Sequence, residues 1–314
     1  IVGVGDMTGD GHPDLLARTS NGITWLYAGD GKGSTAPAVQ FSTGWNDVTA
    51  ITGNGNFTAT PPDVPSSTDP ITGQASPSEP DSYVLTRDGA GALWLHPSDG
   101  KGGVLPAVQV GSGWNAMTAI VAVGDMTGDG HPDLLARDKA GVTWLYPRDG
   151  AGGWLPRKQF GTGWNVMTAI VGVGDMTGDG HPDLLARDSN GITWLYAGDG
   201  KGGAAPAVQF GSGWNVMTAI VGVGDMTGDG PPDLLARTSN GITWLYAGDG
   251  KGSTAPAVQF STGWNDVTAI TGNGNFTATP PDVPSSTDPI TGQASPSEPD
   301  SYVLTRDGAG ALWL

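Results

Sequence analysis

Short apolar runs alternate with glycine- and aspartate-rich turns along the chain, and the pattern returns at intervals of about fifty residues. Runs of this length predict β-strands, and no segment shows a sustained apolar period of 3.6 residues, so we expect almost no helix. Asn190-Gly191 separates two of the runs and is a strong signal for a tight hairpin. In the unit that begins near residue 169, the pattern predicts four strands: Ala169–Gly174, Leu184–Arg187, Ile192–Tyr196 and Ala207–Gly211.

Two tryptophan motifs follow the same repeat. WLY, WLH or WL supplies the third predicted strand of each unit, with its tryptophan at Trp25, Trp94, Trp144, Trp194, Trp244 and Trp313. GWN precedes the first strand of the next unit, with its tryptophan at Trp45, Trp114, Trp164, Trp214 and Trp264. A period near fifty residues with four strands per unit is typical of β-propeller blades. We therefore predict an all-β chain that folds as a single propeller domain of four-stranded antiparallel blades.

Six units are visible, and the last ends after its third strand. We expect either a six-bladed ring or part of a seven-bladed ring. The end of the chain copies its beginning: residues 220–314 repeat residues 1–95 with one difference, His12 against Pro231. The predicted blades span approximately residues 1–48, 49–117, 118–167, 168–217, 218–267 and 268–314.

Composition narrows the class of partner. The chain has 53 Gly and 24 Pro, as a turn-rich β architecture requires, and a formal net charge of −17. So acidic a chain is unsuited to nucleic acid, whose phosphates need a basic surface. No apolar run is long enough to span a membrane. Cysteine is absent, so no disulfide contributes to the fold.

The turn GDMTGDGHPD occurs at Gly5–Asp14, Gly124–Asp133 and Gly174–Asp183, and GDMTGDGPPD occurs at Gly224–Asp233. Each copy places side-chain oxygens at positions 1, 3, 5 and 9 and a glycine at position 6, where the chain must bend sharply. Calcium takes six to eight oxygen ligands, and such a loop supplies carboxylates and a free carbonyl. An ordinary Asp/Gly turn is the alternative for one copy, but four copies favour calcium.

The sequence thus predicts about four Ca²⁺ sites. Their side chains are Asp6, Thr8, Asp10 and Asp14; Asp125, Thr127, Asp129 and Asp133; Asp175, Thr177, Asp179 and Asp183; and Asp225, Thr227, Asp229 and Asp233. Units 2 and 6 lose the carboxylates at positions 1 and 5 and carry a Pro/Ser/Thr-rich insertion, so we expect no calcium there. Their corresponding residues are Asn56, Thr58 and Thr60, and Asn275, Thr277 and Thr279.

The motif D-x-T-x-D-G-x-x-D, together with LLAR, WLY and GWN, resembles FG-GAP/VCBS repeats, the integrin α-subunit type of propeller blade, over essentially the whole chain. It is most similar to repeats appended to secreted actinobacterial proteins. The resemblance implies calcium in the loop between the first two strands of a blade. The family also includes PVL-like lectins, which hold sugars near blade junctions. Thr in place of Asp or Asn at position 3 departs from the family pattern and removes one carboxylate.

Other recurring residues are expected to serve the scaffold. The WLY and GWN tryptophans should pack between blades, with sugar stacking as the alternative for Trp25 and its equivalents. One arginine per unit ends the second strand and should bond the neighbouring blade, or else meet glycan hydroxyls. Trp154 occurs once, in the loop AGGWLP, and is the candidate for an exposed ligand contact, with packing against its own blade as the alternative.

These features favour binding over catalysis. The acidic residues are explained by calcium, and no G-x-S-x-G, HExxH or Walker motif is present. We expect an extracellular, non-catalytic, calcium-binding propeller that recognises a glycan in a lectin-like way or an extracellular protein. The alternative is an accessory, structural or protein-interaction propeller attached to a secreted enzyme.

Overall fold

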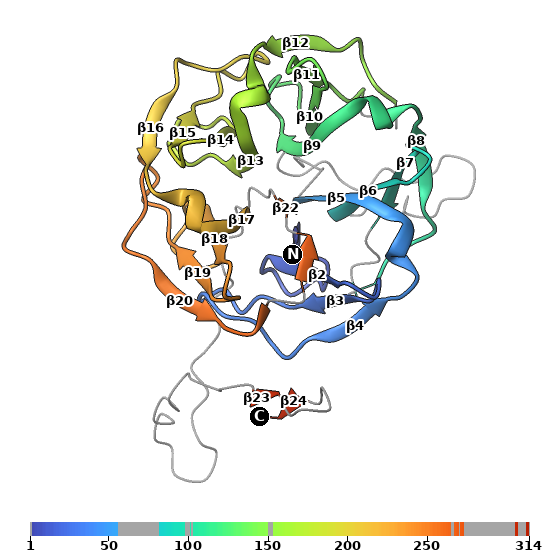
Figure 1. Cartoon of the computed structure of the whole chain (residues 1–314), viewed down its shortest axis with the longest axis vertical. Coiled ribbons are helices and arrows are strands. Elements are labelled where there is room, and N and C mark those ends of the chain that lie inside the picture. Colours follow the sequence, from blue (N-terminus) through green and yellow to red (C-terminus); the bar gives the residue numbers. More distant parts are fainter. Residues whose placement is uncertain are drawn as a thin grey trace, which may run out of the picture. The chain divides into compact units, whose positions relative to one another are not determined.

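A computed structural model describes residues 2–55, 82–97, 101, 103–149, 153–264, 267–269, 271–272, 305–306 and 312–313. The chain divides into two compact units, Ile1–Ala278 and Thr279–Leu314. In the first unit, five antiparallel sheets of four successive strands surround a common axis as propeller blades (Figure 1). The first strand of each blade is innermost, and these inner strands contact their neighbours around the ring.

The blades share one strand plan, which matches the predicted one. Blade 1 contains β1 (Val2–Gly5), β2 (Asp14–Thr19), β3 (Thr24–Tyr27) and β4 (Val39–Ser42). Blade 2 contains β5 (Val48–Gly55), β6 (Ser82–Asp88), β7 (Leu93–Pro97) and β8 (Val108–Gly111). Blade 3 contains β9 (Met117–Gly124), β10 (Asp133–Asp138), β11 (Thr143–Tyr146) and β12 (Lys158–Gly161). Blade 4 contains β13 (Met167–Gly174), β14 (Asp183–Asp188), β15 (Thr193–Tyr196) and β16 (Val208–Gly211). Blade 5 contains β17 (Met217–Gly224), β18 (Asp233–Thr238), β19 (Thr243–Tyr246) and β20 (Val258–Ser261).

Helical structure in the described residues is limited to single turns at blade boundaries. Four 3₁₀ helices connect successive blades: η1 (Trp45–Asp47), η2 (Trp114–Ala116), η3 (Trp164–Val166) and η4 (Trp214–Val216). Each follows a glycine with a positive φ, a conformation that glycine adopts without steric cost. The near absence of helix that the apolar pattern predicted is confirmed for this part of the chain.

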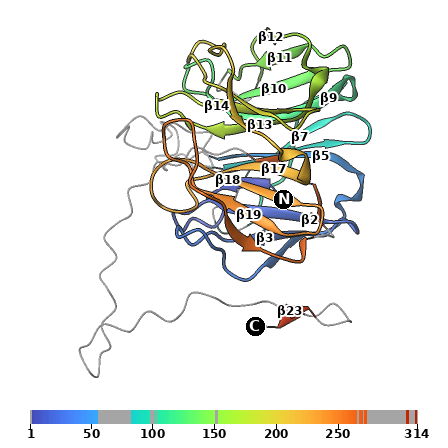
Figure 2. The ribbon, with the colours of Figure 1, turned by 60° about the vertical axis from the view of Figure 1, so that its left-hand side comes forward.

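The hydrophobic core is divided among the junctions between blades. Side chains alternate between the two faces of a strand, so each sheet presents apolar residues to both neighbours. Between blades 3 and 4, for example, Val121 and Leu135 of one blade pack with Leu184 of the other and with Trp164. The GWN tryptophans lie in such clusters at every junction, as predicted. In Figure 2 the sheet of blade 5 lies against that of blade 1, and these two blades share the hydrophobic cluster that contains Leu15, Val221 and Trp264.

The ring closes after five blades, so the expected count of six or seven was wrong. The residues expected to open a sixth blade form β21 (Val267–Ala269), which pairs with β2 of blade 1. Ala269 lies opposite Arg18 just as Ala119 lies opposite Arg137 in blade 3. Trp264 also packs on Tyr27, with ring centroids 5.3 Å apart. The sixth repeat therefore supplies the first part of the inner strand of blade 1, which satisfies the open edge there.

Two short segments follow the closure. β22 (Thr271–Gly272) runs parallel to β1 and contacts the inner strands of all five blades, so it lies near the axis of the ring (Figure 1). In the second unit, β23 (Thr305–Arg306) pairs antiparallel with β24 (Leu312–Trp313). No helix among the described residues is long and apolar enough to cross a membrane.

Candidate functional site

The first aspartate of each acidic loop binds the loop's own backbone. In the loop between β1 and β2, Oδ1 of Asp6 accepts the N–H groups of Gly9 at 2.6 Å and Asp10 at 3.1 Å. Oδ2 accepts the N–H of Gly11 at 2.8 Å. Asp125, Asp175 and Asp225 make the same three bonds in blades 3, 4 and 5. This aspartate therefore holds the turn in shape.

The last aspartate of the loop joins the loop to the connection between the third and fourth strands. Oδ2 of Asp14 accepts the N–H groups of Met7 and Thr8 at 2.8 and 2.9 Å, and Oδ1 accepts that of Gly29 at 3.0 Å. Asp14 is fully buried. Burial disfavours the charged form and raises the pKa of Asp14 to about 6, although these N–H groups oppose the shift. Asp183 and Asp233 have equivalent partners, and their pKa values are also raised to about 6 by burial.

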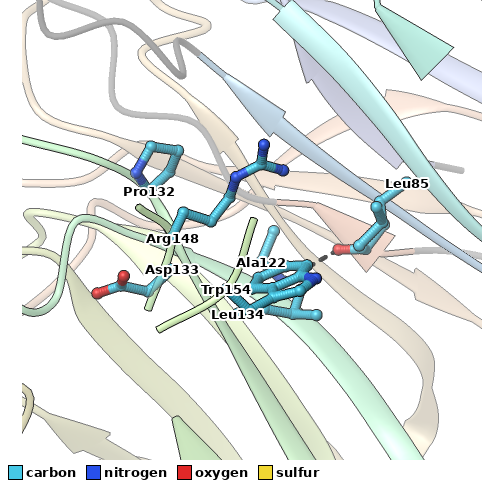
Figure 3. A pocket seen from close by; sticks show the side chains of 8 residues that line it. Leu85, Ala122, Pro132, Asp133, Leu134, Arg148 and Trp154 are labelled. Carbon is cyan, nitrogen blue, oxygen red and sulfur yellow. Dashed lines mark hydrogen bonds between the residues drawn. The ribbon is translucent and has the colours of Figure 1, made fainter. Parts of the chain in front are cut away.

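Asp133 in blade 3 lacks one of these partners. In the other three blades the residue that donates its N–H to Oδ1 of this aspartate is a glycine. A side chain would not fit there, because a Cβ on Gly198 would lie 2.2 Å from the carbonyl oxygen of Pro182. Blade 3 has Arg148 there, and Oδ1 of the buried Asp133 has no hydrogen-bond partner. Burial raises the pKa of Asp133 to about 7. Asp133, Arg148 and Trp154 line a cavity of about 10 Å³, the size of one water molecule (Figure 3).

The acidic loops suit calcium in the type of their donors, because carboxylate, hydroxyl and carbonyl oxygens are what this ion prefers. In the loop of blade 1, Asp6 and Asp14 accept different N–H groups, and Oδ1 of Asp10 accepts the N–H of His12 at 2.9 Å. No three acidic, His or Cys side chains in the described part of the chain lie close enough to hold a metal ion. The predicted lack of calcium in repeats 2 and 6 concerns residues outside the described ranges.

The WLY tryptophans and an outer glutamine form a second repeated feature. In blade 4 the half-buried Trp194 lies directly opposite the exposed Gln209. Tyr196, two residues along the same face, packs on Trp164 with ring centroids 5.0 Å apart, so this face is turned toward the junction with blade 3. We call such a couple a Trp–Gln pair. All five blades have one: Trp25–Gln40, Trp94–Gln109, Trp144–Gln159, Trp194–Gln209 and Trp244–Gln259.

An aspartate fixes the indole in three of these pairs. The indole N–H groups of Trp94, Trp144 and Trp194 donate to Oδ2 of Asp88, Asp138 and Asp188 at 3.0, 3.0 and 3.2 Å. The bond from Trp144 lowers the pKa of Asp138, which keeps that carboxylate charged. Blades 1 and 5 have threonine at the corresponding positions. The sequence interpretation missed the glutamines, although the VQF, VQV or KQF at each fourth strand was a signal that could have identified them.

Trp154 has a packing role in the structure. Its indole N–H donates to the carbonyl oxygen of Val110 in blade 2 at 2.7 Å. Its ring lies 6.1 Å from that of Trp114 and 6.4 Å from that of Tyr146, in the cluster between blades 2 and 3. Trp154 thus bridges two blades while half-buried. Its predicted part in ligand binding stays a prediction.

The recurring arginine also bridges blades, as expected. Nη1 of Arg187 donates to the carbonyl oxygens of Trp214 at 2.9 Å and Met217 at 2.5 Å, at the start of blade 5. Arg18, Arg87 and Arg137 bind the same two backbone positions of the blade that follows each of them. These contacts give the arginines a structural role at the junctions.

Comparison with known sequences places three overlapping stretches, residues 79–136, 125–186 and 175–236, in the FG-GAP-like repeat family. No curated protein matches the chain.

Several solved structures have a similar fold. One concerns an Agrocybe aegerita lectin and its specific recognition of non-reducing terminal N-acetylglucosamine; it is 18% identical, with 82% of this chain and 78% of that chain covered and a TM-score of 0.45. The BP39L lectin from Burkholderia pseudomallei is 12% identical, with 82% and 97% covered and a TM-score of 0.46. The Photorhabdus luminescens Tc holotoxin pore is 15% identical, with 83% and 12% covered and a TM-score of 0.42. At these values the similarities carry no argument about function.

Proposed function

Because the chain belongs to the FG-GAP-like repeat family, we propose that it is a non-catalytic recognition propeller that binds carbohydrate through its Trp–Gln pairs and calcium through its acidic loops. The observation that carries the proposal is the recurrence of one chemical pattern at one register position in all five blades. Strand pairing alone does not require the same aromatic–amide couple five times, because the fold of a propeller tolerates many residues at outer positions.

The Trp–Gln pair suits a saccharide chemically. An indole offers a flat apolar face to the C–H face of a sugar ring, and a side-chain amide both donates to and accepts from hydroxyl groups. Gln209 is exposed beside Trp194, and Asp188 holds the indole N–H, so the ring is oriented before a ligand arrives. One such contact binds weakly. Five on one ring would give avidity for a ligand that repeats the same sugar.

Calcium is the second part of the proposal. Asp6, Thr8, Asp10 and Asp14, and the equivalent residues of blades 3, 4 and 5, would hold the ion, which would neutralise part of the charge of −17. An ion that binds only the folded state stabilises it by mass action. Threonine at position 3 should weaken binding relative to a carboxylate there, which suits the millimolar calcium outside cells. We therefore propose an extracellular location.

A protein-interaction role is the second candidate, and exposed valines favour it. The first residue of the outer strand is valine in four blades, and Val39, Val208 and Val258 are 66%, 67% and 65% exposed. Recurring apolar groups on outer strands offer contacts to a protein partner. They lie one residue from the glutamines of the Trp–Gln pairs, so separate variants can distinguish the two roles.

The test is a glycan array probed with the whole chain, once in millimolar calcium and once with chelator. We expect saturable binding to a set of neutral glycans, stronger in calcium, with no cleavage of the bound sugar. Trp194→Ala should reduce the number of sites measured by calorimetry by one, and Val208→Ala in the same blade is the matched control that keeps the pair.

If the folded chain binds no glycan on the array in the presence of calcium, the carbohydrate proposal is overturned. Loss of a protein ligand in Val208→Asp, with no change in Trp194→Ala, would favour the second candidate instead. Calorimetric titration with Ca²⁺ alone tests the loops independently: no heat, and a melting temperature unaffected by chelator, would exclude them as calcium sites.

A further inference from the structure

We propose that the Trp–Gln pair of blade 3 is selective for anionic saccharides, those that carry a carboxylate or sulfate group. This inference rests on the proposed function, because it assigns a ligand class to one of the five pairs. It comes from Arg157, a cation that the outer segment of blade 3 alone places over its tryptophan; Lys158 follows it but lies opposite Leu145, on the other face of the sheet. The corresponding residues of blade 4 are Ala207 and Val208, and blades 1, 2 and 5 also have Ala-Val.

The arginine is held in place by two aromatic rings. Its guanidinium carbon lies 4.1 Å from the centroid of Trp144 and 5.9 Å from that of Tyr146. Nη1 donates to the hydroxyl oxygen of Tyr146 at 2.9 Å. A guanidinium stacked on an aromatic face is attracted by the negative ring face and loses little further freedom when it binds a ligand. Arg157 is nevertheless exposed, so the cation is both oriented and accessible.

The charge beside this pair differs from that beside the pair of blade 4. In blade 3, Asp138 accepts the indole N–H of Trp144 and the guanidinium of Arg157 lies over the Trp144 ring, so a cation on the same face balances the carboxylate. In blade 4, Asp188 accepts the same bond from Trp194, and Ala207 stands in place of the arginine. A chain that is strongly acidic overall thus places a positive group on one tryptophan of five.

The geometry also indicates how the ligand is selected. The guanidinium covers the face of Trp144 on which a neutral sugar would stack, so neutral sugars should bind this pair more weakly than the others. Only Nη1 is used by Tyr146, which leaves the planar fork of N–H groups for the two oxygens of a carboxylate or sulfate. Gln159, opposite Trp144, is exposed and can meet neighbouring hydroxyls.

The experiment compares matched glycans that differ only in an acidic group: a neutral oligosaccharide, its sulfated form and its sialylated form. The probe is the whole chain in calcium, and the measured quantity is Kd by calorimetry at two salt concentrations. We expect one high-affinity site for an acidic form, about tenfold tighter than the neutral form and weakened by salt. The sulfated and sialylated arms show which acidic group the site accepts.

Two reciprocal variants locate the site. Arg157→Ala should abolish the acidic preference and leave neutral binding at the other pairs unchanged. Ala207→Arg transfers the cation to blade 4 and should create a second acidic site at the expense of a neutral one. Melting temperatures equal to that of the unmodified chain confirm that each variant is folded.

The inference is overturned if neutral and acidic forms bind equally, or if the stripped variant keeps the preference. It is also overturned if poly-aspartate competes as well as the acidic glycan does, since the site would then recognise negative charge and not the saccharide. An absence of binding to both neutral and acidic glycans would instead contradict the proposed function itself, so the two failures are distinguishable.

Discussion

Blades 3 and 4 carry the same acidic loop, GDMTGDGHPD, yet the last aspartate of that loop has different surroundings in the two blades. Asp183 receives an N–H from Gly198, fifteen residues further along the chain, while the equivalent oxygen of Asp133 has no partner. The difference arises because Arg148 stands where blade 4 has Gly198. The comparison teaches that the chemistry of a repeated motif depends on a residue outside it, which the fold brings into contact.

The largest expected difference concerns removal of the two carboxylates. Asp183→Ala leaves the buried N–H group of Gly198 and the partly buried N–H group of Thr177 without an acceptor, and we expect a loss of about 2–4 kcal/mol in the free energy of unfolding. Asp133→Ala leaves only the N–H of Thr127 without an acceptor, and it also removes a poorly solvated carboxylate. The loss in the free energy of unfolding should therefore be about half as large. Urea denaturation of both variants in chelator measures the difference. Equal losses would show that the missing Gly198-type bond has no energetic consequence.

Exchanging the two connecting residues should have a smaller effect. Gly198→Arg places a Cβ 2.2 Å from the carbonyl oxygen of Pro182, so the connection must shift, at a cost of about 1–3 kcal/mol. Arg148→Gly permits the missing bond to Asp133 but removes the guanidinium that lies 5.3 Å from the Trp154 centroid, so stability should change by less than about 1 kcal/mol. Denaturation midpoints compare the two. A tolerated Gly198→Arg would mean that the close approach is not what requires glycine.

The smallest expected effect is on the pH dependence of stability without calcium. A carboxyl whose pKa is higher folded than unfolded binds its proton more tightly in the folded state, so its stabilising contribution is complete below about pH 4 and declines as pH rises. The decline should extend to about pH 6 for Asp14, Asp183 and Asp233, and to about pH 7 for Asp133. Asp133→Asn should remove the part between pH 6 and 7, about 1 kcal/mol. Melting temperatures against pH in chelator test this, and an unaltered profile in the variant would contradict the assignment.

Much of the fold could be predicted from the sequence because its determinants are local. Asn190-Gly191 forms the expected hairpin connection, with φ of 79° at Gly191, and the GWN tryptophans lie at the junctions as their position before each first strand indicated. The blade count could not be predicted in this way. It depends on Ala269 reaching Arg18, a contact between the two ends of the ring, and nothing local in VTAITG distinguishes Val267–Gly272 from the same residues at Val48–Gly53.

The candidate sites could be predicted only in part for a similar reason. Side-chain oxygens at odd positions identified the acidic loops, but the carboxylate of Asp14 turns toward Gly29, whose approach depends on the three-dimensional path of another connection. Trp154 was recognised as unusual from its single occurrence, yet its bond to Val110 lies across a blade boundary. Strand register placed Gln209 beside Trp194, and register follows from pairing rather than composition.

The three residues Val267–Ala269 close the ring of blades by pairing with β2. They are joined to β2 by strand pairing, whereas every other blade has an inner strand made from one continuous segment. Under mechanical load applied across this seam, the pairing of β21 with β2 has the least contact to break. It should separate before any blade loses its own strands. The ring would then open while each blade stays folded, and it would close again when the load is removed.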